Sequence, residues 1–150
     1  MEIERKFTVK ELPNLENIPC KKIVQAYLNT SPVIRIRQED DNYYMTYKGS
    51  GLLCREEYNL PLNEESFRHL LPKADGIIIS KCRYLIPYEN HTIELDIFDG
   101  DLTPLIIAEV EFDSEEDAHK FIGPDWFDED VTLNPAYHNS NLSKRNNAHD

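Results

Sequence analysis

Alternation of polar and apolar residues with a period of two is the main pattern along this chain of 150 residues. Such alternation is typical of strands that have two different faces. Short turn signals rich in Asp, Asn, Gly and Ser separate most of the alternating runs, as in an antiparallel meander. The pattern predicts about eight strands, at residues 1–9, 22–29, 33–39, 43–48, 53–60, 77–88, 92–98 and 105–112.

Two segments with helical spacing interrupt the strands. Asn63 can cap a helix that runs to about residue 71 and ends at a proline. Asp113 and Glu116 predict a capping box for a second helix, which a Gly-Pro pair stops after residue 122. The remaining expected elements are a short strand near residues 129–132, a weak helix in the tail from residue 134, and disorder in the last few residues.

The polar faces of these strands carry long charged side chains, and most strands carry pairs of one sign. Like charges at positions i and i+2 on one face repel each other, and solubility does not require this arrangement. An open sheet with its charged face in water explains any single strand, but it does not explain the whole set. The set has seven basic and seven acidic members: Lys6, Arg35, Arg37, Lys48, Arg55, Lys81, Arg83, Glu2, Glu4, Glu57, Glu94, Asp96, Glu109 and Glu111.

A closed barrel with its charged face inside accounts for this set better. Eight strands can close around an interior that holds side chains or one small ligand. We therefore predict an α+β, mainly β fold, a closed eight-stranded antiparallel β-barrel with a few flanking helices. The apolar face then points outward, where helices or a partner subunit must cover it.

Buried charges need partners, and a polyanion with divalent metal ions would supply them for both signs. Arginine grips phosphate oxygens with two parallel hydrogen bonds, and lysine adds a point charge. Paired carboxylates hold Mg²⁺ or Mn²⁺, which prefer oxygen ligands and can bridge to phosphate. The sequence therefore predicts a site for a small phosphorylated molecule and metal.

Composition narrows the classes of function. The formal net charge of -12 argues against nucleic acid as a partner, because such binding rests on an excess of Lys and Arg. No apolar run approaches the roughly 20 residues that span a bilayer, and the first residues carry no signal stretch, so we expect a cytoplasmic protein. The chain length fits one domain, which we expect to cover residues 1–150. Cys20, Cys54 and Cys82 suggest neither disulfides nor a zinc site.

The order of charged motifs resembles that of the CYTH family, the triphosphate tunnel metalloenzymes. Glu2-Ile3-Glu4-Arg5-Lys6 is followed in order by Arg35-x-Arg37, Lys48, Arg55-x-Glu57, Lys81-x-Arg83, Glu94-x-Asp96 and Glu109-x-Glu111. The closing stretch with Asp130, Val131, Thr132, Tyr137, Asn139 and Leu142 is similar to that of small bacterial members. The resemblance implies an eight-stranded tunnel that takes triphosphates.

By position, the resemblance implies three groups of site residues. Metal would be held by Glu2, Glu4, Glu109 and Glu111. Glu94 and Asp96 would hold a second metal ion or neighbouring basic side chains. The triphosphate would be bound by Lys6, Arg35, Arg37, Lys48, Arg55, Lys81 and Arg83.

The catalytic expectation is a Lys–Tyr pair, which some bacterial members use and which Lys6 and Tyr27 resemble here. We expect other cations to flank Lys6 and to disfavour its charged form, so that Lys6 could accept a proton from water with help from Tyr27. The competing interpretation of Tyr27 is a packed aromatic.

Hydrolysis of a triphosphate, with inorganic tripolyphosphate as the main candidate, is the expected reaction. The open alternatives are cyclisation of ATP, as in class IV adenylyl cyclases, hydrolysis of thiamine triphosphate, and a non-catalytic polyphosphate-binding module. The five histidines are expected to be solvated or structural. A homodimer is compatible with the apolar outer faces.

Overall fold

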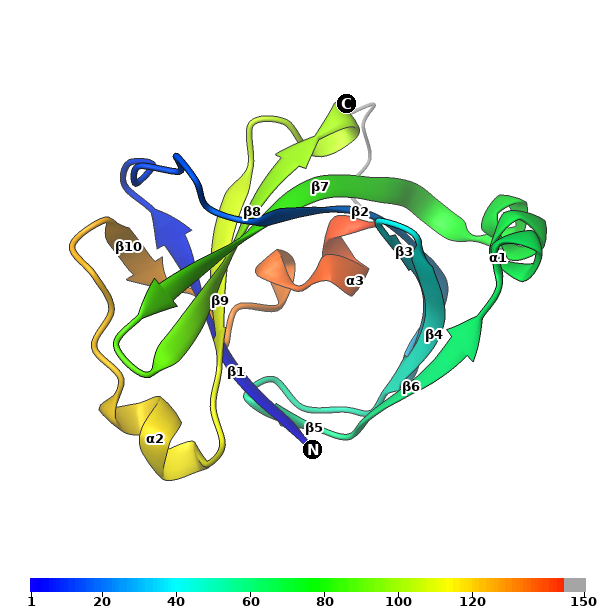
Figure 1. Cartoon of the computed structure of the whole chain (residues 1–150). Helices are drawn as coiled ribbons and strands as arrows, with labels where there is room; N and C mark the ends of the chain where they lie inside the picture. Colours follow the sequence, from blue (N-terminus) through cyan, green and yellow to red (C-terminus); the bar gives the residue numbers. More distant parts are fainter. Residues whose placement is uncertain (145–150) are drawn as a thin grey trace.

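The structure is a computed structural model that describes residues 1–144. Its strands form one antiparallel sheet that curls into a ring around a central space (Figure 1). The predicted mainly β barrel is confirmed. The strands are β1 Glu2–Val9, β2 Cys20–Thr30, β3 Val33–Glu39, β4 Asn42–Lys48, β5 Cys54–Arg55, β6 Glu57–Leu62, β7 Asp75–Tyr88, β8 His91–Asp99, β9 Ile106–Glu111 and β10 Phe127–Asp130.

The ring closes through two short strands where the sequence pattern predicts one continuous strand. The predicted strand 53–60 is broken at Glu56 into β5 and β6. β6 pairs with β4, whereas β5 pairs with the start of β1, where Arg55 lies opposite Glu2. The prediction of eight strands is therefore corrected to nine, in the order β1-β9-β8-β7-β2-β3-β4-β6 with β5 returning to β1. β10 lies outside the ring, against β1.

Residues on the inner face change character along the barrel axis. On β3 the inner row runs Val33, Arg35, Arg37 and Glu39 along the length of the strand. β7 carries the matching row Ile79, Lys81 and Arg83. The apolar members at one end form a buried cluster with Leu142: Tyr27, Val33, Ile79, Phe98, Leu102 and Ile107. One end of the interior is thus sealed by packed apolar side chains, and the charged positions begin above it.

The apolar outer faces are covered largely by helices, as expected. Helix α2 (Glu115–Lys120) packs Ala118 against the outer side of β1, β8 and β9, and α1 (Glu64–Leu70) packs Phe67 against β2 and β3. The same helix covers Tyr43, Met45 and Leu62 on β4 and β6, but the outer side of these two strands is exposed farther from α1. Tyr47, Tyr58 and Leu60 are the large apolar side chains exposed there.

The two helix caps were predicted with different success. The Asn63 carboxamide accepts a hydrogen bond from the Ser66 backbone N–H at 2.7 Å, which confirms this cap. The predicted box of Asp113 and Glu116 is wrong by one residue. Ser114 is extended and accepts from the backbone N–H of Asp117 at 3.1 Å, so its short hydroxyl side chain caps the helix instead.

The C-terminal segment turns back into the ring, where Figure 1 shows α3 (Asn139–Leu142) inside the barrel. We call residues 132–143, which include η3 (Pro135–Tyr137) and α3, the plug. The expected weak tail helix is confirmed as α3, whereas the short strand lies at β10, two residues before its predicted position. The predicted disorder of the last residues falls mainly outside residues 1–144.

Gly76 on β7 makes the close approach of the plug possible. The Ile77 backbone N–H donates to the Ser143 carbonyl at 2.7 Å. Gly76 has φ +71°, and a Cβ atom there would lie 2.2 Å from the Ser143 carbonyl oxygen. Only glycine fits this conformation and this contact. Two 3₁₀ turns, η1 (Leu71–Lys73) and η2 (Gly100–Leu102), complete the described elements, and no helix in residues 1–144 could cross a membrane.

Candidate active site in the barrel

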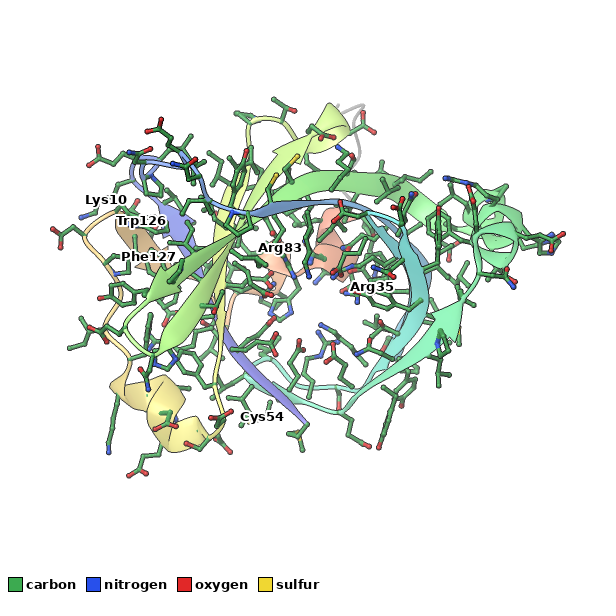
Figure 2. The ribbon with its side chains drawn as sticks, in the orientation of Figure 1. Lys10, Arg35, Cys54, Arg83, Trp126 and Phe127 are labelled. Atoms are coloured by element: carbon green, nitrogen blue, oxygen red, sulfur yellow. The ribbon has the colours of Figure 1, made fainter. Side chains whose placement is uncertain are left out.

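The barrel interior contains a polar cavity of about 190 Å³. Its wall divides into two arcs, because strands of like charge are neighbours in the ring. Figure 2 shows Arg35 and Arg83 inside the ring, whereas Lys10, Trp126 and Phe127 lie outside it. The acidic arc, on β1, β8 and β9, consists of Glu2, Glu4, Glu94, Glu109 and Glu111. The basic arc, on β2 to β5, consists of Lys21, Arg35, Arg37, Lys48 and Arg55.

Arg37 is held in place by three neighbouring side chains. Its Nε donates to the Gln25 amide oxygen at 2.8 Å, and its Nη1 lies 3.4 Å from Glu39 Oε2 and 3.3 Å from Tyr44 Oη. The Tyr44 hydroxyl in turn donates to Glu39. Burial opposes the ionisation of Glu39, but Tyr44 and Lys21 outweigh it and lower its pKa to about 2. Arg37 is therefore presented to the cavity with a fixed orientation.

Arg35 lies deeper and has no carboxylate partner among residues 1–144. Only 4% of it is exposed, and its Nη2 donates to the neutral Thr46 hydroxyl at 3.0 Å. Its buried Nε has no hydrogen-bond partner within the described chain. Burial, followed by the charge of Arg37, lowers the pKa of Arg35. A buried cation without an anion is costly, so this position is suited to an anionic ligand.

The acidic arc carries more negative charge than its cations neutralise. Burial and the neighbouring Glu109 raise the pKa of Glu4, and burial also raises that of Glu94. Burial and then Glu94 raise the pKa of Glu111 to about 7. Glu109 is the exception, since Lys6 and Arg83 outweigh its burial and hold its pKa well below the ordinary range. The surplus of hard oxygen donors fits a divalent cation.

Within residues 1–144, no group of three or more His, Cys, Asp or Glu side chains is already arranged as an ion site. The carboxylates of the acidic arc therefore provide the donors, but their side chains would have to converge on a metal ion.

The prediction that other cations surround Lys6 is wrong. Its Nζ lies 2.6 Å from Glu109 Oε2 and 3.6 Å from Glu4 Oε1, so its nearest neighbours are carboxylates and not cations. Burial would lower the pKa of Lys6, but these two carboxylates outweigh it and raise the pKa. In this arrangement Lys6 is protonated and suited to binding a phosphate oxygen.

Tyr27 lines the cavity, and its ring also packs in the apolar cluster at the sealed end. Its hydroxyl accepts a hydrogen bond from the Gln25 amide at 3.4 Å. Both sequence interpretations, a packed aromatic and a site residue, are therefore compatible with its position. Its strand, β2, is separated from β1 and Lys6 by three other strands in the ring.

Lys81 and Asp96 are fully buried and do not line the cavity. Asp96 binds Lys81 Nζ at 2.6 Å, and it binds Arg83 through Nε at 2.7 Å and Nη2 at 2.8 Å. Asp96 was expected either to bind a second metal ion or to hold neighbouring basic side chains, and this geometry favours the second role. Arg83 itself reaches the cavity and also contacts Glu109 and Glu94.

Several residues that line the cavity were not among the predicted site residues. Lys21 lies one residue before the predicted second strand, so a longer strand would have included it. Glu39 lies within the predicted strand 33–39, at a spacing of two from Arg37, and could have been assigned to the same face. Others come from the plug, which had no signal in the strand pattern. The missed residues are Lys21, Val33, Glu39, Tyr44, Asn59, His138, Asn139 and Ser140.

His138 agrees with the structural role expected for the histidines. It is buried, with its Nε2 3.2 Å from the Thr132 carbonyl oxygen, and burial lowers its pKa.

Comparison with known proteins identifies the family. The CYTH domain matches residues 1–145. This chain belongs to the CYTH family. An inorganic triphosphatase from Nitrosomonas europaea is 41% identical over 149 residues, which cover 95% of this chain and 96% of that protein. A second inorganic triphosphatase, from Acetivibrio thermocellus, is 35% identical over 95% of this chain and 93% of its own length.

A solved structure of an inorganic triphosphatase shares this CYTH fold. It has a TM-score of 0.74 and 36% sequence identity, and the match covers 97% of this chain and 96% of the solved one. The resemblance drawn from the ordered charge motifs is confirmed by these comparisons.

Proposed function

We propose that this CYTH protein hydrolyses inorganic triphosphate with the help of a divalent metal ion. The observation that carries the proposal is the cavity with one basic and one acidic arc. The basic arc fits a chain of phosphoryl groups, and the acidic arc fits the metal ions that accompany it. The two relatives named inorganic triphosphatase, which match nearly the whole chain, support the same reaction.

The substrate side of the mechanism rests on positioning and charge. Phosphoryl transfer needs little covalent chemistry from the protein, so fixed cations supply most of the stabilisation. Arg37 is oriented by Gln25 and Glu39, and Arg35 offers an unpaired guanidinium edge. We propose that Lys6, Lys48, Arg55 and Arg83 complete the phosphate contacts, while Lys81 acts through Asp96 because it does not reach the cavity.

The metal side would be held by Glu2, Glu4, Glu94 and Glu111. When bound, Mg²⁺ or Mn²⁺ would neutralise phosphate charge and lower the pKa of a bound water. Glu109 remains a predicted ligand, although in this structure Lys6 and Arg83 contact its two oxygens. Lys6 and Tyr27 also remain the predicted catalytic pair. With its carboxylate neighbours, Lys6 would act first as a phosphate-binding cation, and Tyr27 would present its hydroxyl to the cavity.

A measurement of phosphate release tests the proposal. The compounds are inorganic tripolyphosphate, ATP and thiamine triphosphate, and each is assayed with Mg²⁺, with Mn²⁺ and with a chelator. We expect metal-dependent release that is fastest with tripolyphosphate. Arg37→Ala should reduce kcat/KM by about 100-fold or more, as for loss of a transition-state contact. Arg68→Ala is the matched control, because Arg68 lies exposed on α1, away from the cavity.

Other outcomes would point to the alternatives. Cyclic AMP formed from ATP without phosphate release would indicate a cyclase, and preference for thiamine triphosphate would indicate that organic substrate. Binding without any turnover would indicate a polyphosphate-binding module.

For the cell, we propose a cytoplasmic protein whose partner is the small-molecule triphosphate and not nucleic acid. The formal net charge of -12 supports the exclusion of nucleic acid as a partner. We also propose a homodimer, supported by the exposed Tyr47, Tyr58 and Leu60 on the outer side of β4 and β6. Light scattering coupled to size-exclusion chromatography would measure the mass directly, and a monomeric mass at micromolar concentration would contradict the dimer.

A further inference from the structure

The plug contributes side chains to the cavity at the sealed end of the barrel. Leu142 of α3 packs with Val33 of β3 in the apolar cluster that closes this end. Val33 begins the inner row of β3, and Arg35 is the next residue on that row. Arg35 is therefore the first charged side chain above the seal on β3, and Asn139, on the same short helix as Leu142, lines the same cavity.

Two unsatisfied polar groups meet the cavity here. Arg35 Nε is a buried donor without a partner, and Asn139 Oδ1 is a buried acceptor without a partner within residues 1–144. Buried polar groups are nearly always hydrogen-bonded, so two orphans in one cavity point to a ligand. A half-turn of the Asn139 carboxamide exchanges its oxygen and nitrogen without changing its shape, and this would present two N–H donors.

We propose that Asn139 and Arg35 form a subsite for the terminal phosphoryl group of a linear phosphate chain. This inference deepens the proposed function and rests on it for the class of ligand. The apolar cluster that contains Val33 and Leu142 lies behind the subsite, so a linear substrate would enter with one end first. A neutral amide suits this place, because it can donate to phosphate without needing an acidic partner when the cavity is empty.

The subsite predicts discrimination between linear and cyclic triphosphate. Inorganic tripolyphosphate has terminal phosphoryl groups with three non-bridging oxygens each, whereas cyclic trimetaphosphate has three phosphorus atoms and no end. Asn139→Ala should weaken binding of the linear compound about 10-fold, or about 1.4 kcal/mol. Binding of the cyclic compound should change less than about 2-fold, so the preference for the linear compound should fall.

Isothermal titration of the whole chain with each compound, in excess chelator and again with Mg²⁺, makes this test. Asn42→Ala is the matched control, because Asn42 is exposed at the start of β4 and does not line the cavity. Asn139→Asp provides a second variant of nearly the same size. Its negative charge should weaken binding of the linear compound more than Asn139→Ala does, and thermal unfolding of each variant checks that the plug still folds.

Equal weakening for linear and cyclic compounds would overturn the subsite, because it would show that Asn139 only supports the plug. Unchanged affinities in both variants would overturn it as well, as would failure of the parent chain to bind tripolyphosphate under either condition. Linear-selective binding that depends on Asn139, without any turnover, would support the subsite while contradicting the proposed hydrolysis.

Discussion

At the scale of single residues, the cations of the cavity differ in whether an acid neutralises them. Lys6, Lys48, Arg37 and Arg83 each have a carboxylate within 4 Å, whereas Arg35 has none in the described chain. Acid-paired cations can be stable before the ligand arrives. Arg35 carries an electrostatic cost in the empty protein, which an incoming phosphate would relieve.

Replacing Arg35 should therefore separate stability from activity. Arg35→Met removes a buried charge without leaving another unpaired, so we expect an unchanged or higher midpoint of thermal unfolding. Triphosphate turnover should fall about 100-fold or more, since a phosphate contact is lost. Thermal unfolding and phosphate release, measured on the same preparation, check both parts.

Lys81→Met is the contrasting variant. It removes one of the two cations that bind the buried Asp96. Breaking a buried pair of this kind typically costs about 3–5 kcal/mol, so this variant should unfold at a clearly lower temperature. If Arg35→Met lost as much stability as Lys81→Met, this would contradict the inference that Arg35 is an unpaired buried charge whereas Lys81 is a paired one.

The acidic arc predicts a pH dependence of stability in the metal-free protein. Glu111 has a folded-state pKa of about 7, above its ordinary value of 4.5, and the pKa values of Glu4 and Glu94 are also raised. Between pH 4.5 and about pH 7, these carboxyl groups therefore bind more protons in the folded state than in the unfolded state. The free energy of unfolding should therefore decrease as pH rises from about 4.5 to about 7.

Urea unfolding in chelator across this pH range measures the slope. Glu111 lies at the exposed rim of the cavity, so solvent screening will limit its share. Glu111→Gln should make the slope shallower, and added Mg²⁺ should do the same if the arc binds metal. Stability that rises with pH through this range would contradict the assigned repulsion.

At the scale of elements, two breaks in the regular pattern build the site. The break at Glu56 lets one segment pair with β4 and then with β1, which closes the ring. The turn into the plug brings α3 inside the barrel and seals one end. The helix caps and strand positions follow local rules and were largely predictable, whereas the docking of α3 depends on contacts with distant strands.

Gly76→Ala tests how the plug docks. A methyl group at Gly76 would meet the Ser143 carbonyl at 2.2 Å and would also strain the backbone at φ +71°. We expect a loss of about 1–3 kcal/mol, with faster hydrogen exchange in residues 132–143. Denaturant unfolding and hydrogen-exchange mass spectrometry measure these effects.

Gly100→Ala is the matched control for backbone strain. Gly100 has a similar φ of +65°, but a Cβ atom there would meet nothing within 4 Å. It should cost less than Gly76→Ala and leave exchange in the plug unchanged. Equal effects of the two substitutions would show that strain alone, and not the contact with Ser143, is responsible.

At the scale of the whole molecule, folding brings like charges together on each side of one cavity. The acidic strands β1, β8 and β9 are adjacent in the ring although β1 is far from the other two in the sequence. Charges concentrated in this way oppose each other in the empty protein. Binding of metal and phosphate together would neutralise both arcs, so ligands should stabilise the fold jointly.

A triphosphate analogue with non-hydrolysable bridges tests this coupling. At 100 times its dissociation constant, a ligand that binds only the folded state stabilises it by about 2.7 kcal/mol. We expect the analogue with Mg²⁺ to raise the unfolding midpoint more than the sum of their separate effects. Thermal scans of the parent chain and of Arg35→Met measure the unfolding midpoint with each ligand alone and with both. If the shift of the midpoint with both ligands equals the sum of the two separate shifts, this would contradict the coupling.

The sequence by itself determined most of the strands, their charged faces and the family. Alternation with a period of two is a local property, so Arg35 and Arg37, or Glu109 and Glu111, could be assigned to one face without a structure. The order of the charged motifs along the chain was enough to recognise the CYTH family. These features need no knowledge of which strands are neighbours.

Only the tertiary structure decided which charges neutralise each other. Lys6 meets Glu109 across 103 positions of sequence, so its carboxylate environment could not be read from its own strand. Ring closure at Glu56, the fully buried Asp96 and the entry of Asn139 into the cavity have the same origin. Each depends on pairing between distant segments, which a local repeat does not encode because every strand with the same period fits many neighbours equally well.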